Sequence, residues 1–464
     1  MSRRSSFGLA LVAALSAGCH GAPPRTPAYS LPDAAPVAFS EPGEALAPSA
    51  WWSTFGDADL DGVVAHALED NPGLAVAAAR CRRAHALARL EGAARQPTLD
   101  GVGRAGASLA RRRLGSGLET DGSVTAGLGL EAGYELDLWG RLRAAHDAAR
   151  FEAVATRHDR EAARVALAGS IAIAWVRRAA TAEEAALLEE QLATNEDLLQ
   201  VVQQRFDGGQ AAAPDVFRQQ QLVERTRAER ARNAVERELL VHQLNVLRGR
   251  PPREPLPLGG ALPQPGPLPA TGVPADVLGR RPDLAAARAR IAAADRDLAS
   301  ALADRAPRVR LGADLGIGGG DLEDLFREWA AALAYELVGP IADGGARDAT
   351  VAAACALRDE RIASYTDLLL ASALEVEDAL RGEALGQEVL ERLERQHDFA
   401  RQTVESLLGR YGQGAADYFE VLGAVESEQA LARTLVAQRA TLVERRVQLL
   451  RALAGPIAPG DTGP

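Results

Sequence analysis

The side chains that could carry out acid–base, metal or nucleophilic chemistry are scattered along this sequence. No two histidines form an HExxH pair, the spacing that puts two zinc ligands on one face of a helix. The cysteines form no CxxC unit and no cysteine–histidine pattern of the kind that binds zinc. The histidines are His20, His66, His85, His146, His158, His242 and His397, and the cysteines are Cys19, Cys81 and Cys355. The sequence therefore predicts no enzyme, no metal site and no cofactor.

Two weaker signals do not change this prediction. The glycine-rich stretch 316–320 resembles a dinucleotide-binding loop only loosely, because Asp321 stands where the last glycine of that motif belongs. No phosphate-binding loop of the Walker type is present. Cys81 and Cys355 lie in helical patterns, and we interpret them as small buried apolar residues, with a disulfide between them left open.

Three acidic side chains stand where predicted helices begin. Asp215 follows Pro214 in a first helical turn, where a carboxylate interacts favourably with the helix dipole. Asp417 and Glu420 have the Asp-x-x-Glu spacing of a capping box. Helix capping is therefore the local role that the spacing predicts for these acids.

The elements that position these residues change from strand to helix within the stretch 123–207. Apolar residues from Val124 to Leu138 alternate with polar or small residues from Thr125 to Asp137, which is typical of a strand with two unlike faces. Residues 141–207 contain no proline and one glycine, Gly169. Such a helix reaches about 100 Å, which is far longer than helices of ordinary globular domains.

The chain is an internal duplication. Asn71-Pro72 and Arg281-Pro282 open similar helices 210 positions apart, Tyr134-Glu135-Leu136 recurs as Tyr335-Glu336-Leu337, and Arg205-Phe206 before Gly209 recurs as Arg410-Tyr411 before Gly414. Each half predicts a helix, two strands, a very long helix, a turn and a second long helix. The predicted strands cover 99–109, 124–138, 309–317 and 329–337, with a polar loop at 111–122.

The N-terminal segment has the features of an export signal. Arg3 and Arg4 precede an apolar run, and small residues lead to Cys19. No later segment offers about 20 continuous apolar residues, so no membrane-spanning helix is predicted. The predicted organisation is a signal peptide (1–18), an extended tether (19–50), a first repeat (51–249), a proline-rich connector (250–274), a second repeat (275–455) and a tail (456–464).

The charge composition argues against one class of binding partner. The net charge is −11 and no block of basic residues stands out, which argues against nucleic acid as a partner. Hydrophobic residues make up 47% of the chain but aromatic residues only 4%, as in long helices and coiled coils.

Four two-faced strands cannot close a barrel by themselves, since the smallest common barrels have about eight strands. Either the strands form a soluble sheet packed on a helical domain, or several chains pool them. Apolar residues on one face suit lipid, with Trp139, Trp329 and Tyr335 as interfacial anchors. The charged residues of the other face suit water; they are Glu131, Glu135, Asp137, Arg310 and Asp314.

The order of elements, the duplication and several motifs resemble the TolC-like outer-membrane factors, in the lipoprotein branch of efflux proteins. The resemblance covers Cys19 to about Gly455. Its motifs are Cys19 after Ala17-Gly18, Trp51-Trp52 with Phe55 and Asp57, Asn71-Pro72, Tyr134-Glu135-Leu136-Asp137-Leu138-Trp139-Gly140-Arg141, Arg205-Phe206 with Gly209, Arg280-Arg281-Pro282-Asp283-Leu284, and Arg410-Tyr411 with Gly414.

The resemblance implies an α+β membrane protein: a trimeric 12-stranded β-barrel, four strands per chain, continuous with a long α-helical coiled-coil barrel in the periplasm. It implies a homotrimer in the outer membrane, lipid-anchored at Cys19, that serves as a passive exit duct for small molecules such as drugs and toxic compounds. The implied partners are a periplasmic adaptor protein, an inner-membrane efflux transporter and outer-membrane lipid. The alternatives are an ordinary signal peptide cut near Cys19, a type I protein-secretion channel, and a periplasmic lipoprotein scaffold without a pore.

The resemblance also assigns a periplasmic gate at the helix turns. By position, Asp215 and Glu420 are the acids that ring the pore, Tyr411 is the aromatic residue that hydrogen-bonds across to Asp215, and Asp417 lies beside them. This sequence departs from the pattern at Gly423, where a second ring acid is often found, and at Ala416, where an arginine can occur. Gating and capping are compatible roles for the acids.

Overall fold

The computed structural model describes residues 30, 39–40, 49–114, 117–256, 261–264, 278–319 and 328–457, except for the side chains of 112–121. The predicted signal peptide, Cys19, most of the tether, much of the connector and most of the tail lie outside the described residues. The chain divides into two compact units. Residues 80–156 and 286–365 belong to the first, and residues 33–79, 157–285 and 366–464 to the second.

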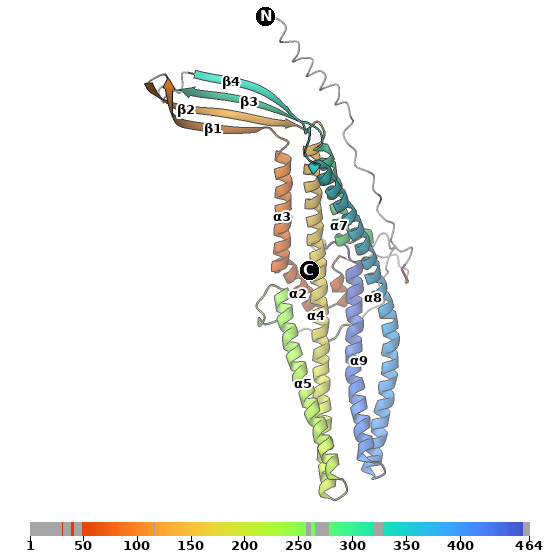
Figure 1. Ribbon diagram of the computed structural model, residues 1–464. Helices are drawn as coiled ribbons and strands as arrows, with labels where there is room; N and C mark the ends of the chain where they lie inside the picture. Colours follow the sequence, from red (N-terminus) through yellow and green to blue (C-terminus); the bar gives the residue numbers. More distant parts are fainter. Residues whose placement is uncertain are drawn as a thin grey trace. The chain divides into compact units, whose positions relative to one another are not determined.

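The elements follow the predicted order twice (Figure 1). They are η1 (Trp51–Phe55), α2 (Ala58–Asp70), α3 (Pro72–Ala93), β1 (Thr98–Leu114), β2 (Gly117–Leu136), α4 (Arg141–Asp207), α5 (Ala213–Leu247), α7 (Pro282–Ala303), β3 (Arg308–Gly319), β4 (Glu328–Val338), α8 (Ala346–Gly412) and α9 (Tyr418–Leu453).

The first unit contains one antiparallel sheet in the order β1-β2-β3-β4. The predicted polar loop at 111–122 is wrong, because strand pairing continues to Leu114 opposite Gly117, with Arg111 opposite Thr120. Polar side chains do not stop a strand whose main-chain groups remain paired. They mark only where the apolar face ends.

The register confirms the predicted two-faced strands. Ala132, Ala313 and Leu333 lie in one row across β2, β3 and β4, and Glu131, Asp314 and Ala332 in the next. Successive rows point to opposite faces of a sheet, so one face carries the apolar residues and the other the charged ones. All eleven residues of β4 are exposed.

Two residues at the end of β2 differ from their predicted places. Asp137 lies beyond the strand, and its carboxylate accepts hydrogen bonds from the amides of Leu142 (3.1 Å) and Arg143 (2.7 Å) at the start of α4. The prediction that Asp137 belongs to the charged face is therefore wrong: it caps the helix. Trp139 is half-buried and donates its indole hydrogen bond to the main-chain oxygen of Pro307 (2.8 Å).

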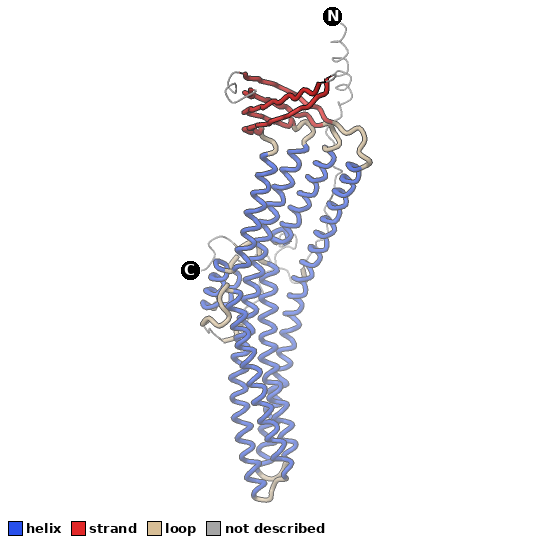
Figure 2. The backbone as a smooth tube through the Cα atoms, turned by 60° about the vertical axis from the view of Figure 1, so that its left-hand side comes forward, coloured by secondary structure: helices blue, strands red, loops and turns tan. Residues whose placement is uncertain are grey.

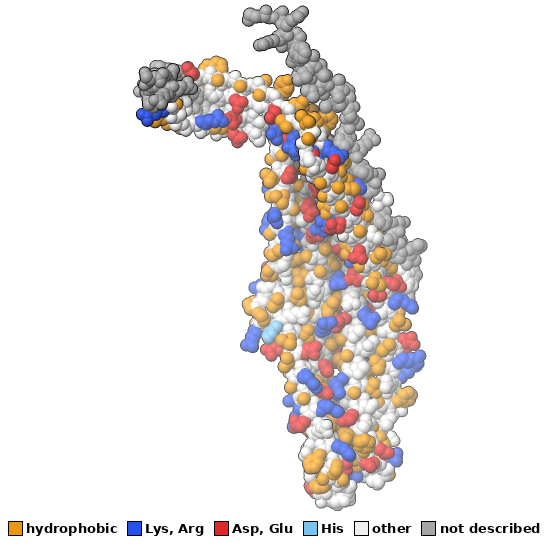
Figure 3. Space-filling model, in the orientation of Figure 1, with side chains coloured by type: hydrophobic (Ala, Val, Ile, Leu, Met, Phe, Trp, Pro, Cys, Tyr) orange, Lys and Arg blue, Asp and Glu red, His pale blue; other side chains and the backbone are white. Residues whose placement is uncertain are grey.

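In the second unit, α4, α5, α8 and α9 run side by side (Figure 1, Figure 2). The observed bounds of α4, Arg141–Asp207, are the predicted ones. Charged side chains of both signs are mixed over the visible surface of the helices (Figure 3), with no large basic patch. Among the described residues, α4 alone is long and apolar enough to cross a membrane, but 72% of that stretch is buried within the protein. It is therefore a core helix.

The main core of the second unit is built around buried tryptophans. Trp51 and Trp52 pack edge to face, with ring centroids 5.8 Å apart, and join Trp175 of α4 in the same cluster. Asp57 links them to α2, since one carboxylate oxygen accepts from Trp175 Nε1 (2.8 Å) and the other from the amide of Leu60 (3.1 Å). The tryptophan pair is therefore part of the core.

The single glycine of α4 marks a close helix contact. A Cβ atom on Gly169 would lie 2.7 Å from Cδ of Arg451, so the side chain of Arg451 on α9 packs directly against the main chain of α4. The two cysteines of the helices, Cys81 and Cys355, are free and half-buried. The interpretation of these cysteines as buried residues is therefore only partly met, and no disulfide joins them.

Candidate functional site

Two turns of the second unit lie next to each other, and both are closed in the same way. The α4–α5 turn contains Gly209 (φ 71°), and the α8–α9 turn contains Gly414 (φ 72°). Positive φ favours glycine, which explains the recurring motif. The amide of Gln210 donates to the oxygen of Arg205 (2.7 Å), and the amide of Ala415 donates to the oxygen of Arg410 (2.8 Å). The duplication therefore extends to the hydrogen bonds of the turns.

Arg205 holds the two turns together. Its guanidinium donates to the main-chain oxygen of Gly412 (3.0 Å) and stacks 4.2 Å from the ring centre of Tyr411. The equivalent Arg410 instead donates to Ala415 within its own turn (3.0 Å). Both arginines belong to the same repeated sequence motif, and nothing in that motif distinguishes the one that contacts the other turn.

The predicted acids lie at the starts of α5 and α9. Asp215 is half-buried, and its carboxylate accepts from the amide of Ala212 (3.2 Å) and from Arg218 (3.3 Å). Asp417 is the N-cap of α9 and accepts from the amide of Phe419 (3.0 Å). Glu420 is exposed in the first turn of α9. The capping role predicted for Asp215 and Asp417 is thus confirmed, whereas Glu420 accepts no bond from the amide of Asp417, so the predicted Asp-x-x-Glu capping box does not form.

Tyr411 is buried, with 7% of its surface exposed, and its hydroxyl has no hydrogen-bond partner among the described residues. The bond from Tyr411 to Asp215 therefore does not form within one chain, and it stays a prediction between chains. The ring of Tyr411 packs against Tyr418, with centroids 5.9 Å apart. Burial raises the pKa of Tyr418 above its ordinary value, and the neighbouring Tyr411 and Asp215 raise it further.

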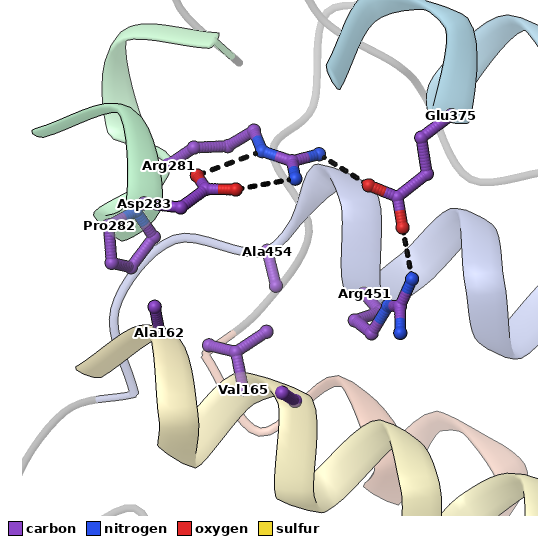
Figure 4. Close-up of a pocket in the computed structure, with 9 residues that line it drawn as sticks. Ala162, Val165, Arg281, Pro282, Asp283, Glu375, Arg451 and Ala454 are labelled. Atoms are coloured by element: carbon purple, nitrogen blue, oxygen red, sulfur yellow. Dashed lines mark hydrogen bonds and ion pairs between the residues drawn. The ribbon is translucent and has the colours of Figure 1, made fainter. Parts of the chain in front are cut away.

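A second cluster surrounds Arg281, in the motif that carries much of the resemblance (Figure 4). Arg281 donates to Asp283 (2.8 Å) and to Glu375 of α8 (2.9 Å), and Glu375 also pairs with Arg451 of α9. They line a cavity of about 270 Å³ whose apolar side includes Val165 and Ala454. Burial would lower the pKa of Arg281, but hydrogen bonds and charges from Asp283 and Glu375 raise it overall.

The Arg281 cluster has a counterpart in the first repeat. Asn71 donates from its side chain to the main-chain oxygen of Leu247, at the end of α5 (2.7 Å), while Arg281 donates to the oxygen of Ala452, at the end of α9 (3.5 Å). In each repeat the residue before the proline therefore ties the start of one helix to the end of another. This points to a structural role for the motif. No group of three or more potential metal ligands occurs among the described residues.

Comparison with known proteins agrees with this architecture. The family model for outer membrane efflux proteins matches residues 63–249 and 273–455. The outer membrane protein OprJ of Pseudomonas aeruginosa is 30% identical over 446 residues, which cover 92% of this chain and 91% of OprJ. The pyoverdine export outer membrane protein OpmQ of Pseudomonas putida is 29% identical, covering 89% of each chain.

Solved structures show the same fold. The outer-membrane channel OprN superposes with a TM-score of 0.86 at 27% identity and covers 94% of this chain and 99% of its own. The outer membrane protein VceC of Vibrio cholerae superposes with a TM-score of 0.82 at 26% identity and covers 89% of this chain and all of its own. The family model matches both repeats of this chain. The chain therefore belongs to the outer membrane efflux protein family and serves as an outer-membrane exit duct for efflux.

Proposed function

We propose that three copies of this chain form one passive duct through the outer membrane, which releases small molecules delivered by an inner-membrane transporter through a periplasmic adaptor protein. The observation that carries this proposal is the unclosed sheet. Its outer strands β1 and β4 each have one unpaired edge, and in lipid such edges leave main-chain groups without hydrogen bonds. Three sheets of four strands supply twelve, enough to close a barrel.

The apolar face has the dimensions of a membrane band. On β4 the apolar residues run from Trp329 to Leu337, eight positions apart, or about 27 Å along the strand at ~3.4 Å per residue. At the ~40° tilt of barrel strands this length spans about 21 Å of membrane thickness. Membrane barrels carry an apolar band about 25 Å tall, edged by aromatic residues. Trp329 and Tyr335 are 75% and 70% exposed, as lipid-facing anchors near the two edges of the band would be.

The other face suits a water-filled lumen. Among its described strand residues, six are acidic and three are basic; the acids are Asp100, Glu131, Glu135, Asp314, Glu328 and Glu336, and the bases are Arg104, Arg308 and Arg310. Glu135 pairs with Arg310 (3.6 Å) and with Arg141 (2.6 Å). A charged face of this kind is stable in water and costly in lipid.

The proposed transporter and adaptor follow from the need for an energy source to drive transport. The sequence has no Walker-type loop, so a passive duct needs an energised transporter to deliver its cargo. Relatives of this chain include the toluene efflux pump outer membrane protein TtgF and the probable efflux pump outer membrane protein SepC, both from Pseudomonas putida and 28% identical. Their names support a pump as the setting of this chain.

Exchanging one residue on each face of β4 tests the membrane barrel. Leu333→Arg places a charge on the apolar face and is expected to cost about 2–4 kcal/mol near the bilayer midplane. Ala332→Arg, at the same depth on the charged face and opposite Asp314, is the matched control. We expect heat-resistant trimers in outer-membrane fractions to be lost for Leu333→Arg and kept for Ala332→Arg. Equal trimer yields would contradict the assignment of faces.

The lipid anchor at Cys19 is a further part of the proposal. Phe39 is buried between α8 and α9, and the amide of Ser40 donates to Glu377 (3.1 Å), so the chain is attached to the second unit at this point. Twenty residues separate Cys19 from Phe39, and an extended chain of that length reaches at most about 70 Å.

Metabolic labelling with palmitate tests the anchor. Wild-type protein should incorporate the label and Cys19→Ser should not, while both remain in the outer membrane, because the barrel supplies the main hold on lipid. An unlabelled wild-type protein would show instead that the signal peptide is of the ordinary kind.

We also propose that the two turns form the gate of the duct. Asp215 and Glu420 would then lie in acidic rings when three copies assemble, and Tyr411 would find the partner that its hydroxyl lacks within one chain. Closely spaced carboxylates repel each other and attract cations. The capping bonds of Asp215 and Asp417 fix the helix starts that carry these rings.

Neutralising the ring acids tests the gate. In planar bilayers the Asp215→Asn, Glu420→Gln double variant is expected to show a higher single-channel conductance and a weaker cation preference than wild type. The asparagine introduced at position 215 keeps a side-chain oxygen that can accept the bond from the amide of Ala212, so capping is retained. Asp398→Asn, which changes an exposed acid of α8, serves as the control and should behave as wild type. If the double variant keeps both properties unchanged, these acids do not line the gate.

A further inference from the structure

The apolar core along α4, α5 and α9 is interrupted by buried polar side chains. On one side lies the tip cluster, beside the two turns, and its members are Val202, Val216, Leu222, Tyr411, Tyr418, Val421, Leu422 and Val425. On the other side lies the main core, which α9 joins from Val436 onward. What we call the amide layer consists of Gln191 and Asn195 of α4, Gln219 and Thr226 of α5, and Gln429 of α9. Along their helices Gln191, Asn195, Thr226 and Gln429 lie between the two clusters, and Gln219 lies at the inner end of the tip cluster, between Val216 and Leu222. Each of its five side chains is at most 5% exposed.

The centre of the layer is a reciprocal pair of amides. Asn195 donates to the side-chain oxygen of Gln429 (3.2 Å), and Gln429 donates back to that of Asn195 (2.8 Å). Gln191 donates to the main-chain oxygen of Gln429 (3.1 Å). All three bonds join α4 to α9. Arg433 of α9 also donates to the side-chain oxygen of Gln191 (2.6 Å).

Two further bonds of the layer stay within the α4–α5 hairpin. Asn195 also donates to the hydroxyl of Thr226 (3.0 Å), and Gln219 donates to the main-chain oxygen of Asn195 (2.7 Å). Asn195 is therefore held by α5 whether or not Gln429 is present. Gln219 also accepts a bond from the hydroxyl of Tyr418, which connects the layer to the first residue of α9.

The free energy needed to pull two helices apart differs between buried amide contacts and buried apolar contacts. An apolar cluster that opens exposes surface to water at a continuous cost. An amide pair fixes one register while it is intact, and each partner regains hydrogen bonds from water once it separates. A polar layer between two apolar clusters therefore lets one cluster come apart while the other stays packed.

We propose that the amide layer is a latch for the tip. In the closed duct it holds α9 in register against the α4–α5 hairpin. Opening breaks the Asn195–Gln429 pair and the bonds that join Gln191 and Gln219 to α9, while the bonds within the hairpin persist. The main core beyond the layer stays intact. The proposal rests on the proposed function, since it assumes a duct that opens at these turns.

The test compares open probability in planar bilayers for three variants. Gln429→Leu leaves the side-chain oxygen of Asn195 buried without its donor, so the closed state is destabilised and open probability should rise by about tenfold. Asn195→Leu with Gln429→Leu replaces the pair by an apolar contact that joins the two clusters, and open probability should fall below that of wild type. Asn233→Leu is the matched control. It removes a buried amide that bonds to Thr181 (3.0 Å) and so joins only α4 and α5. It should lower the melting temperature of the trimer without changing open probability.

Opposite changes in the single and double variants support the latch. Equal open probability in all three variants, with lower melting temperatures, would show that the layer only packs the helices and would overturn the latch. Gln429→Met, which keeps the length of the side chain, replaces Gln429→Leu if that variant does not assemble. If neither wild type nor any of the variants conducts ions, the proposed function is refuted, and the latch with it.

Discussion

The constraint on which this protein depends is that the main-chain groups at the two outer edges of its sheet have no strand to pair with. Four antiparallel strands have their inner main-chain groups paired, but the outer edges of β1 and β4 are open. An open edge is tolerated in water and is costly in lipid, where nothing else can bond to it. Because one face of this sheet is apolar, the sheet belongs in lipid, and the edges then require other copies. The barrel is thus a property of the assembly, while each chain contributes only a segment of it.

In the helical unit, specific contacts keep the long helices in one register. Apolar contacts alone allow helices to slide, since one leucine replaces another at little cost. Here the register is fixed by local features: Gly169 admits Arg451, Asn71 and Arg281 bond to the ends of α5 and α9, and the amide layer joins α4 to α9. Each of these contacts holds only in one alignment of the helices.

Much of this architecture could be predicted from the sequence because it rests on periodicity. Alternation predicted the faces of the strands, and the glycines at 140, 208 and 209 marked the two ends of α4. The hairpin of β1 and β2 was underestimated because Arg111 and its neighbours lack the apolar alternation, although their main-chain groups pair. Asp137 was misplaced because alternation continues past the last strand residue into the cap of α4.

The site was less predictable, because it depends on which of two equivalent residues makes a contact. The repeats give Arg205 and Arg410 the same motif, yet only Arg205 reaches across to the other turn, where it stacks on Tyr411. The pairing of Asn195 with Gln429 joins residues 234 positions apart, and no periodic pattern encodes it. The glycines of the turns were correctly marked, since positive φ leaves a direct trace in the sequence.

The most direct test of this account is the mass of the assembly that mild detergent extracts from the outer membrane, measured by native mass spectrometry. The account predicts a particle of three chains, because three sheets satisfy the edges that one sheet leaves open. A single chain that stays monodisperse in detergent-free buffer would contradict it, since such a chain would need neither lipid nor partners to complete its sheet.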